Sequence, residues 1–120
     1  MANRAGVNVQ QKRALHVLGY LFLRMGQYAR ARRLFAALTA LDPGDLHARC
    51  SLALSCIRLE DGEAALHTLT GLAPGDPLPG GDATLHLLLA RAHALVGDTT
   101  AAREAAAAFW NARRAGSKEQ

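Results

Sequence analysis

Apolar residues recur along this chain at helical spacing, and short breaker segments divide them into six stretches. Leu15, Leu18 and Phe22, for example, follow the i, i+3, i+7 pattern that places side chains on one face of a helix. The pattern predicts an all-α fold. The predicted helices cover residues 9–25, 28–40, 46–59, 62–72, 83–95 and 99–114.

The ends of these stretches carry residues that start and stop helices. Gly26 and Gly97 stand where a helix must end in a left-handed residue, and Pro43 and Pro77 prevent a second helix from continuing. Aspartates that can accept the unpaired amide protons of a helix start precede four predicted helices, at Asp45, Asp61, Asp82 and Asp98. The stretch 73–81 is the one real loop, and it is either a tolerated insertion or a contact loop.

The same pair of predicted helices occurs three times in tandem. A shift of 34 residues carries Leu18, Gly19 and Ala31 onto Leu52, Ala53 and Ala65. A further shift of 37 residues carries those onto Leu89, Ala90 and Ala102. The repeat predicts one domain over residues 12–116, made of the hairpins 12–45, 46–81 and 82–116, with a flexible segment 1–11 and a tail 117–120.

Small residues recur at one point of each predicted hairpin. We expect Gly19, Ala53 and Ala90 to face Ala31, Ala65 and Ala102 across the pair, because small side chains allow two helix axes to approach closely. Leucines neighbour the small residues of the first helices, at Leu18, Leu52 and Leu89. All of these repeat positions are interpreted as core rather than as a binding site.

Helical hairpins repeated at this period resemble tetratricopeptide repeats (TPRs). The first repeat matches the family pattern best, through Leu15, Leu18, Gly19, Phe22, Gly26, Tyr28, Ala31, Phe35 and Pro43. The second repeat lacks the aromatic residue and the glycine of the first helix, and no proline closes the third. The resemblance implies a short right-handed α-solenoid that binds other proteins.

Three such repeats with almost no N-terminal extension also resemble the small chaperones of bacterial type III secretion. The stretches 18–26 and 31–43 are most similar to the YscY (SctY) type. That resemblance implies a cytoplasmic chaperone that binds a small secreted partner of the YscX (SctX) type and engages the export gate with it. Needle-subunit chaperones of the YscG type, the longer translocator chaperones and a general TPR adaptor or scaffold remain alternatives.

The TPR pattern also places a candidate partner-binding groove along the first helix of each hairpin. Its predicted lining is His16, Tyr20, Leu23, Arg24, His47, Cys50, Leu54, Ile57, Arg58, Leu87 and Arg91. Apolar side chains would form the floor of this groove and arginines its edge. Such a groove fits an amphipathic helix or an extended peptide that carries apolar anchors and acidic groups.

Two apolar regions lack an obvious cover. The first helix is apolar on nearly every side, although an end helix has neighbours on only one side, so we expect a partner to cover Tyr20 and Leu23. The last helix carries Trp110, which either packs on the last hairpin or contacts a partner.

Composition agrees with a single helical domain. The chain has 120 residues, of which 50% are hydrophobic, and a formal net charge of +4. Its arginine clusters at 30–33 and 113–114 are read as solvated helix faces, with an acidic protein surface and nucleic acid as the other possibilities, and no nucleic-acid partner is expected. No convincing signal peptide and no segment long enough to span a bilayer is found, which favours the cytoplasm.

The sequence contains few residues at spacings that suit catalysis, metal binding or a disulfide. Cys50 and Cys56 stand six residues apart on one predicted helix, so their side chains diverge and we expect free, buried thiols. His47 and Cys50 form the one ligand-like pair, but a structural zinc needs four ligands. We therefore expect no metal, no cofactor and no enzymatic activity.

Overall fold

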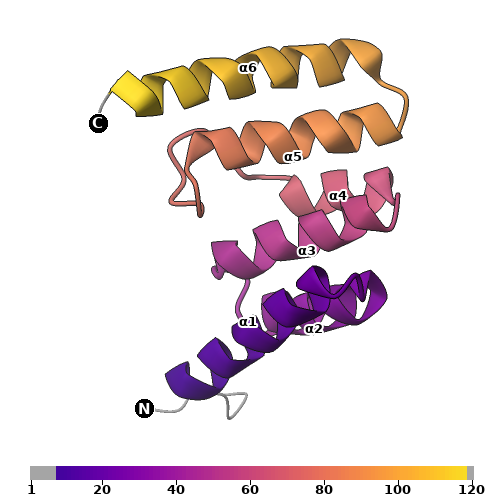
Figure 1. Ribbon diagram of the computed structural model, residues 1–120, viewed down its shortest axis with the longest axis vertical. Helices are drawn as coiled ribbons and strands as arrows, with labels where there is room; N and C mark the ends of the chain where they lie inside the picture. Colours follow the sequence, from indigo (N-terminus) through magenta and orange to yellow (C-terminus); the bar gives the residue numbers. More distant parts are fainter. Residues whose placement is uncertain (1–7, 119–120) are drawn as a thin grey trace.

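Six α-helices pair into three antiparallel hairpins. The computed structural model describes residues 8–118, and within that range no strand is present. The helices are α1 (Val9–Arg24), α2 (Tyr28–Leu41), α3 (Leu46–Arg58), α4 (Gly62–Leu69), α5 (Asp82–Leu95) and α6 (Thr99–Lys118). The hairpins stack in chain order, from α1 and α2 at one end to α6 at the other (Figure 1). This arrangement confirms the predicted all-α array of tandem hairpins.

Most helix starts are capped as their sequence predicts. Asp45, Asp61 and Asp98 each accept a backbone N–H three residues on, at 3.1 Å from the acceptor oxygen. The prediction for Asp82 is wrong, because Asp82 is the first residue of α5 and Gly81 precedes it with φ of 70°. Its carboxylate instead accepts the amide proton of Gly75 across the loop.

Helix α1 begins at Val9, the predicted start, and so takes in part of the segment predicted to be flexible. The flexible segment was predicted to run to residue 11, but Asn8 caps α1 in a reciprocal pair with Gln11, so residues 8–11 belong to the ordered helix start. Residues 1–7 lie outside the described residues. The predicted tail 117–120 begins inside α6, which continues to Lys118, and residues 119–120 are likewise outside the described range.

Helix α4 is shorter than predicted and ends at Leu69 instead of residue 72. Arg49 on α3 donates Nη2 hydrogen bonds to the carbonyl oxygens of Thr68 and Thr70, at 2.9 and 2.7 Å. These oxygens are left unpaired where the helix stops, so the arginine satisfies them. Gly71 then adopts a φ of 88°, which takes the chain out of the helical direction.

The core is continuous from α3 to α5. Cys50, Ala53, Cys56 and Ile57 of α3 pack with residues of α4 and α5 and with Leu78, which is 7% exposed. Leu78 anchors the loop 73–81 in the core, while most other residues of the loop are exposed. Both cysteines are free thiols, as expected, and burial raises their pKa.

A second, smaller core cluster holds the first hairpin together. It contains Ala31, Phe35 and Leu38 of α2. A Cβ added to Gly19 would clash with the Phe35 ring, so Gly19 lies directly against this side chain. The core assignment of Leu18 is also wrong, because Leu18 points away from α2 and is 42% exposed.

The remaining repeat positions are buried to different degrees. Ala53 and Ala65 are fully buried in the middle hairpin. The corresponding positions of the third hairpin, Ala90 and Ala102, are half-buried. Leu52 and Leu89 pack against the core from partly buried positions.

Candidate functional site

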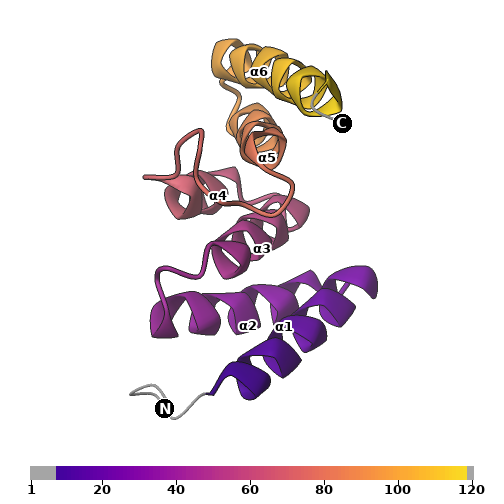
Figure 2. The ribbon, with the colours of Figure 1, turned by 90° about the vertical axis from the view of Figure 1, so that its left-hand side faces the viewer.

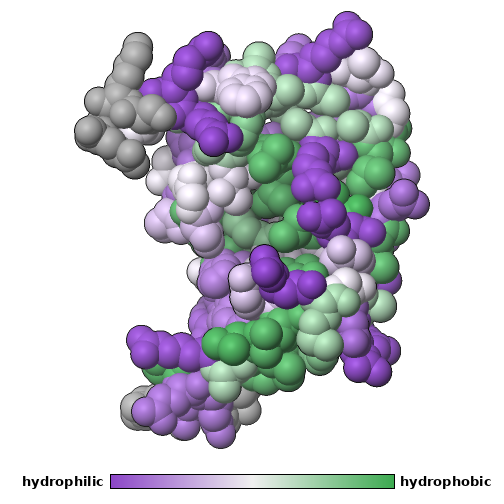
Figure 3. Space-filling view, in the orientation of Figure 1, coloured by the Kyte–Doolittle hydropathy of each residue, from purple (hydrophilic) through white to green (hydrophobic). Residues whose placement is uncertain are grey.

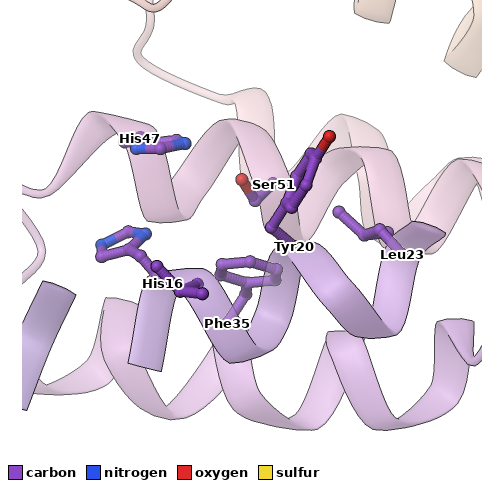
Figure 4. A pocket seen from close by; sticks show the side chains of 7 residues that line it. His16, Tyr20, Leu23, Phe35, His47 and Ser51 are labelled. Atoms are coloured by element: carbon purple, nitrogen blue, oxygen red, sulfur yellow. The ribbon is translucent and has the colours of Figure 1, made fainter. Parts of the chain in front are cut away.

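A cleft of about 210 Å³ opens between α1 and α3. Tyr20 and Leu23 project into it from α1, and Phe35 of α2 forms its floor (Figure 4). The lining is His16, Val17, Tyr20, Leu23, Phe35, His47 and Ser51. Its wall is almost wholly apolar, and the polar groups of the lining residues are the two imidazoles and the hydroxyls of Tyr20 and Ser51.

The cleft exists because α1 stands apart from α3. In the middle of the array α3 packs directly on α5, but no comparable helix contact joins α1 to α3 within residues 8–118. Figure 2 shows α1 running obliquely to α2 at the end of the stack. Phe35 is large enough to hold α1 against α2 while α1 and α3 stay separated.

Polar contacts bridge α1 to the start of α3 at one end of the cleft. Lys12 Nζ lies 2.7 Å from Asp42 Oδ2 and 3.2 Å from Asp45 Oδ2. His16 Nε2 lies 2.8 Å from the same Asp45 oxygen. The Asp45 side chain is 8% exposed, so one nearly buried carboxylate joins the first hairpin to α3.

The environment of Asp45 stabilises its charged form. Burial acts to raise the pKa of this carboxyl, but the amide of Ala48, His16 and Lys12 donate hydrogen bonds that together lower the pKa below its usual value. Asp45 is therefore a carboxylate at neutral pH and serves as both helix cap and ion-pair partner.

The two histidines form the polar rim of the cleft. The rings of His16 and His47 stack with centroids 4.7 Å apart and an interplanar angle of 21°. Desolvation and then the charge of His16 lower the pKa of His47, and Asp45 opposes them only in part. His47 therefore presents a neutral aromatic face beside the apolar lining at neutral pH.

The structure brings together four of the predicted groove residues and separates the others. His16, Tyr20, Leu23 and His47 line the cleft. The prediction for Cys50 is wrong, because its side chain is buried in the core and only 6% exposed. Ile57 is also a core residue, at 5% exposed, but it lines the shallow depression that contains Arg58 and Arg91.

Leu54 is also misplaced in the predicted groove. It is partly buried and packs against the same core cluster. Direct packing of α5 on α3 covers this part of the predicted floor.

The remaining predicted groove residues lie elsewhere on the surface. Arg58 and Arg91 line a shallow depression near the ends of α3 and α5, and Arg58 stands over the ring of Tyr28 at 5.8 Å. Arg24 and Leu87 are exposed and line neither depression. The predicted continuous groove is thus an apolar cleft at the first hairpin and a separate basic depression.

Sequence reasoning missed three residues of the cleft. Val17 was counted among the apolar residues of the first helix but not placed in the groove, and Phe35 was read as core only. Ser51 follows His47 by four residues on α3, so the helical period gives the signal that was overlooked.

Trp110 does not pack into the third hairpin. Its side chain is 56% exposed. It contacts the ring of Phe109 edge-on at 5.1 Å and lies under the Arg113 guanidinium. This leaves a second exposed aromatic surface at the far end of the array.

The geometry provides no ligand set for the His47–Cys50 pair. Cys50 points into the core, whereas His47 stacks on His16 at the surface. Within the described range 8–118, no three metal-ligating side chains converge. None of the helices there is long and apolar enough to cross a membrane.

The tetratricopeptide repeat family matches residues 22–79. No curated protein matches the chain. The matched stretch runs from the end of α1 through the second hairpin, and the structure adds a third hairpin of the same kind. This match and the stacked hairpins support a TPR-type architecture, which typically serves as a scaffold for protein–protein interaction.

Proposed function

We propose that this protein is a chaperone of bacterial type III secretion that binds a small secreted protein of the YscX type and masks its apolar segment. The cleft between α1 and α3 is the observation that carries this proposal. An apolar anchor of the partner enters the cleft beside Tyr20 and Leu23. The resemblance of residues 18–43 to the YscY type supports the choice of partner.

The dimensions of the cleft suit a peptide anchor. Its volume of about 210 Å³ is below the roughly 300–1,000 Å³ of typical small-ligand sites. A single bulky apolar side chain presented on a helix or an extended segment is a better match. The neutral ring of His47 then borders the anchor at the rim of the cleft.

Masking works as an equilibrium. An apolar segment held in the cleft is removed from water and from other exposed segments, so it does not aggregate before export. In this proposal the complex travels to the export gate in the cytoplasm and releases the partner there. Release requires no chemistry beyond competition for the same apolar surface.

The test is co-purification with a co-expressed YscX-type protein. Tyr20 is 56% exposed, so Tyr20→Glu should leave the fold intact, yet it places a carboxylate against the bound apolar anchor. We expect the variant to lose the partner on a column while its circular dichroism spectrum stays unchanged.

Trp110→Glu is the matched control, because Trp110 is an aromatic residue with the same 56% exposure at the other end of the array. This variant should retain the partner. If Tyr20→Glu retains the partner and Trp110→Glu loses it, the binding site lies on α6 and not in the cleft. A wild-type chain that captures a needle subunit and not the YscX-type protein would favour the needle-subunit chaperone.

A further inference from the structure

Helix α1 carries a second apolar stripe that faces away from both α2 and the cleft. Ala14, Leu18, Leu21 and Met25 follow one another at intervals of four, three and four residues, which is the spacing of a coiled-coil seam. All four are exposed, and Leu18, Leu21 and Met25 are 42%, 46% and 66% exposed. Figure 3 shows apolar surface gathered over α1 at this end of the molecule.

The spacing of this stripe indicates what covers it. A seam of this period presents about three turns of straight, narrow apolar surface, and a second α-helix lying along it packs its own side chains between these residues. An extended peptide would contact the stripe through every second residue of its own chain, and this spacing does not match a seam of this kind. The stripe therefore fits a helix that continues the stack of the array beyond α1.

The charge of α1 decides between a second copy of this chain and a different protein. The helix carries Lys12, Arg13 and Arg24 and contains no acidic residue. Arg13 and Arg24 each directly precede a seam residue, and neither forms an ion pair with any residue between 8 and 118. Pairing two copies along this stripe would bring these like charges together, which is destabilising.

We propose that the outer face of α1 docks an amphipathic helix of a partner protein that carries acidic residues beside its apolar seam. The leucines of that helix pack against Leu18, Leu21 and Met25, and its acidic groups face Arg13 and Arg24. This interface is separate from the cleft, so one partner or two different partners can occupy the two faces of α1 at once.

The probe is a fluorescent synthetic peptide of about three heptads, with leucines at the seam and glutamates at both flanks. The glutamates also keep the peptide from pairing with itself. Binding to the full chain is measured by fluorescence anisotropy. We expect Leu21→Glu to weaken binding by roughly 30-fold or more, as for the loss of an interface hot spot, and a peptide with lysines at the flanks to bind about fivefold more weakly.

Tyr20→Glu separates this inference from the proposed cleft. Tyr20 neighbours Leu21 in sequence but lies in the cleft, so its variant should bind the peptide within about twofold of wild type. If Tyr20→Glu abolishes binding and Leu21→Glu does not, the helix occupies the cleft and the inference is wrong.

Three further results would overturn the proposal. The first is equal binding of the lysine and glutamate peptides. The second is a wild-type dimer in sedimentation equilibrium that Leu21→Glu dissociates, which would make a second copy the occupant. The third is binding of the chain to phosphatidylglycerol vesicles, lost in Leu21→Glu, without binding to either peptide.

Discussion

Helices α1 and α3 occupy the same place in consecutive repeats but differ in burial. A shift of 34 residues carries His16, Tyr20 and Leu23 onto Cys50, Leu54 and Ile57. The first three line an open cleft, whereas Cys50 and Ile57 are buried and Leu54 is partly buried. Gly19 is the one buried residue of α1, but six residues of α3 are buried.

The difference arises from the neighbours of each helix. Helix α3 has α2 and α4 beside it and α5 directly across its inner face. Helix α1 packs on α2 alone and touches α3 mainly through polar side chains. The same repeat position therefore stabilises the fold in the middle of the array and remains free for binding at its end.

The largest effect should come from filling the contact that fixes α1. Gly19→Leu forces a side chain into the buried ring of Phe35, which is 1% exposed and cannot move aside. Overpacking typically costs about 1–3 kcal/mol, and more where the neighbour cannot give way, so we expect α1 to detach and the thermal unfolding temperature to fall steeply.

Gly116→Leu is the control for this variant. Gly116 is an exposed residue of α6 with open space around its Cα, and leucine is a better helix former than glycine. It should leave stability unchanged or raise it slightly. A melting curve for Gly19→Leu that matches the Gly116→Leu curve would contradict the close contact of α1 with Phe35.

Truncating equivalent residues of the two helices tests the comparison directly. Ile57→Ala should cost about 2–4 kcal/mol, because it opens a cavity in the core. Leu23→Ala removes a side chain from the wall of an open cleft, and we expect about 1 kcal/mol. Urea denaturation of both variants measures the two costs. Equal costs would mean that α1 is as well packed as α3.

The sequence predicts the helices well because residues at or next to each boundary determine where most helices begin and end. Gly26 and Gly97 adopt φ of 74° and 82°, as expected of glycines that end a helix. Three of the four aspartate caps form as predicted. Helix α4 ends early, where its carbonyls pair with Arg49, which lies 19 and 21 residues away, and a local pattern does not contain such a contact.

The candidate site was predicted only in part because its shape depends on relations between helices. Periodicity placed Tyr20 and Ile57 on equivalent faces of their helices. It carried no information about the distance between α1 and α3 or between α3 and α5. That distance decides whether a side chain lines a cleft or fills a core. Helix α5 packs directly on α3, whereas no comparable contact joins α1 to α3 among residues 8–118.

The polar bridge between α1 and α3 should make stability depend on pH. Asp45→Asn keeps an acceptor for the amide of Ala48 but removes the ion pair with Lys12 and the charged partner of His16, so we expect a loss of about 1–2 kcal/mol at pH 7. The folded pKa of Asp45 is lowered, so its contribution is complete above the ordinary aspartate pKa of about 4. The contribution disappears as the pH falls from there through the lower folded value.

Urea unfolding of wild type and Asp45→Asn between pH 7 and pH 3 checks this prediction. The difference between the two should be constant in the upper part of this range and should shrink in the lower part. Asp61→Asn is the control, because Asp61 also caps a helix but pairs with Arg32 at a solvent-exposed site. A difference for Asp45→Asn that persists unchanged at pH 3 would rule out the carboxylate as its source.

The smallest effect concerns the turns that follow α1 and α3. Glu60 stands in register with Gly26 and, like it, adopts a left-handed backbone, with φ of 61°. A residue with a side chain costs about 1–2 kcal/mol in that conformation. Replacing it with glycine removes this strain, but part of the stabilisation is lost because glycine loses more entropy on folding. Glu60→Gly should therefore stabilise the protein by roughly 0.5–1 kcal/mol, which raises the unfolding temperature by a few degrees. Glu60→Ala keeps the backbone strain, so it should leave the melting temperature nearly unchanged. If both variants instead lower it, the Glu60 side chain contributes an interaction that outweighs the strain, and the turn after α3 is held more firmly than the glycine turn after α1.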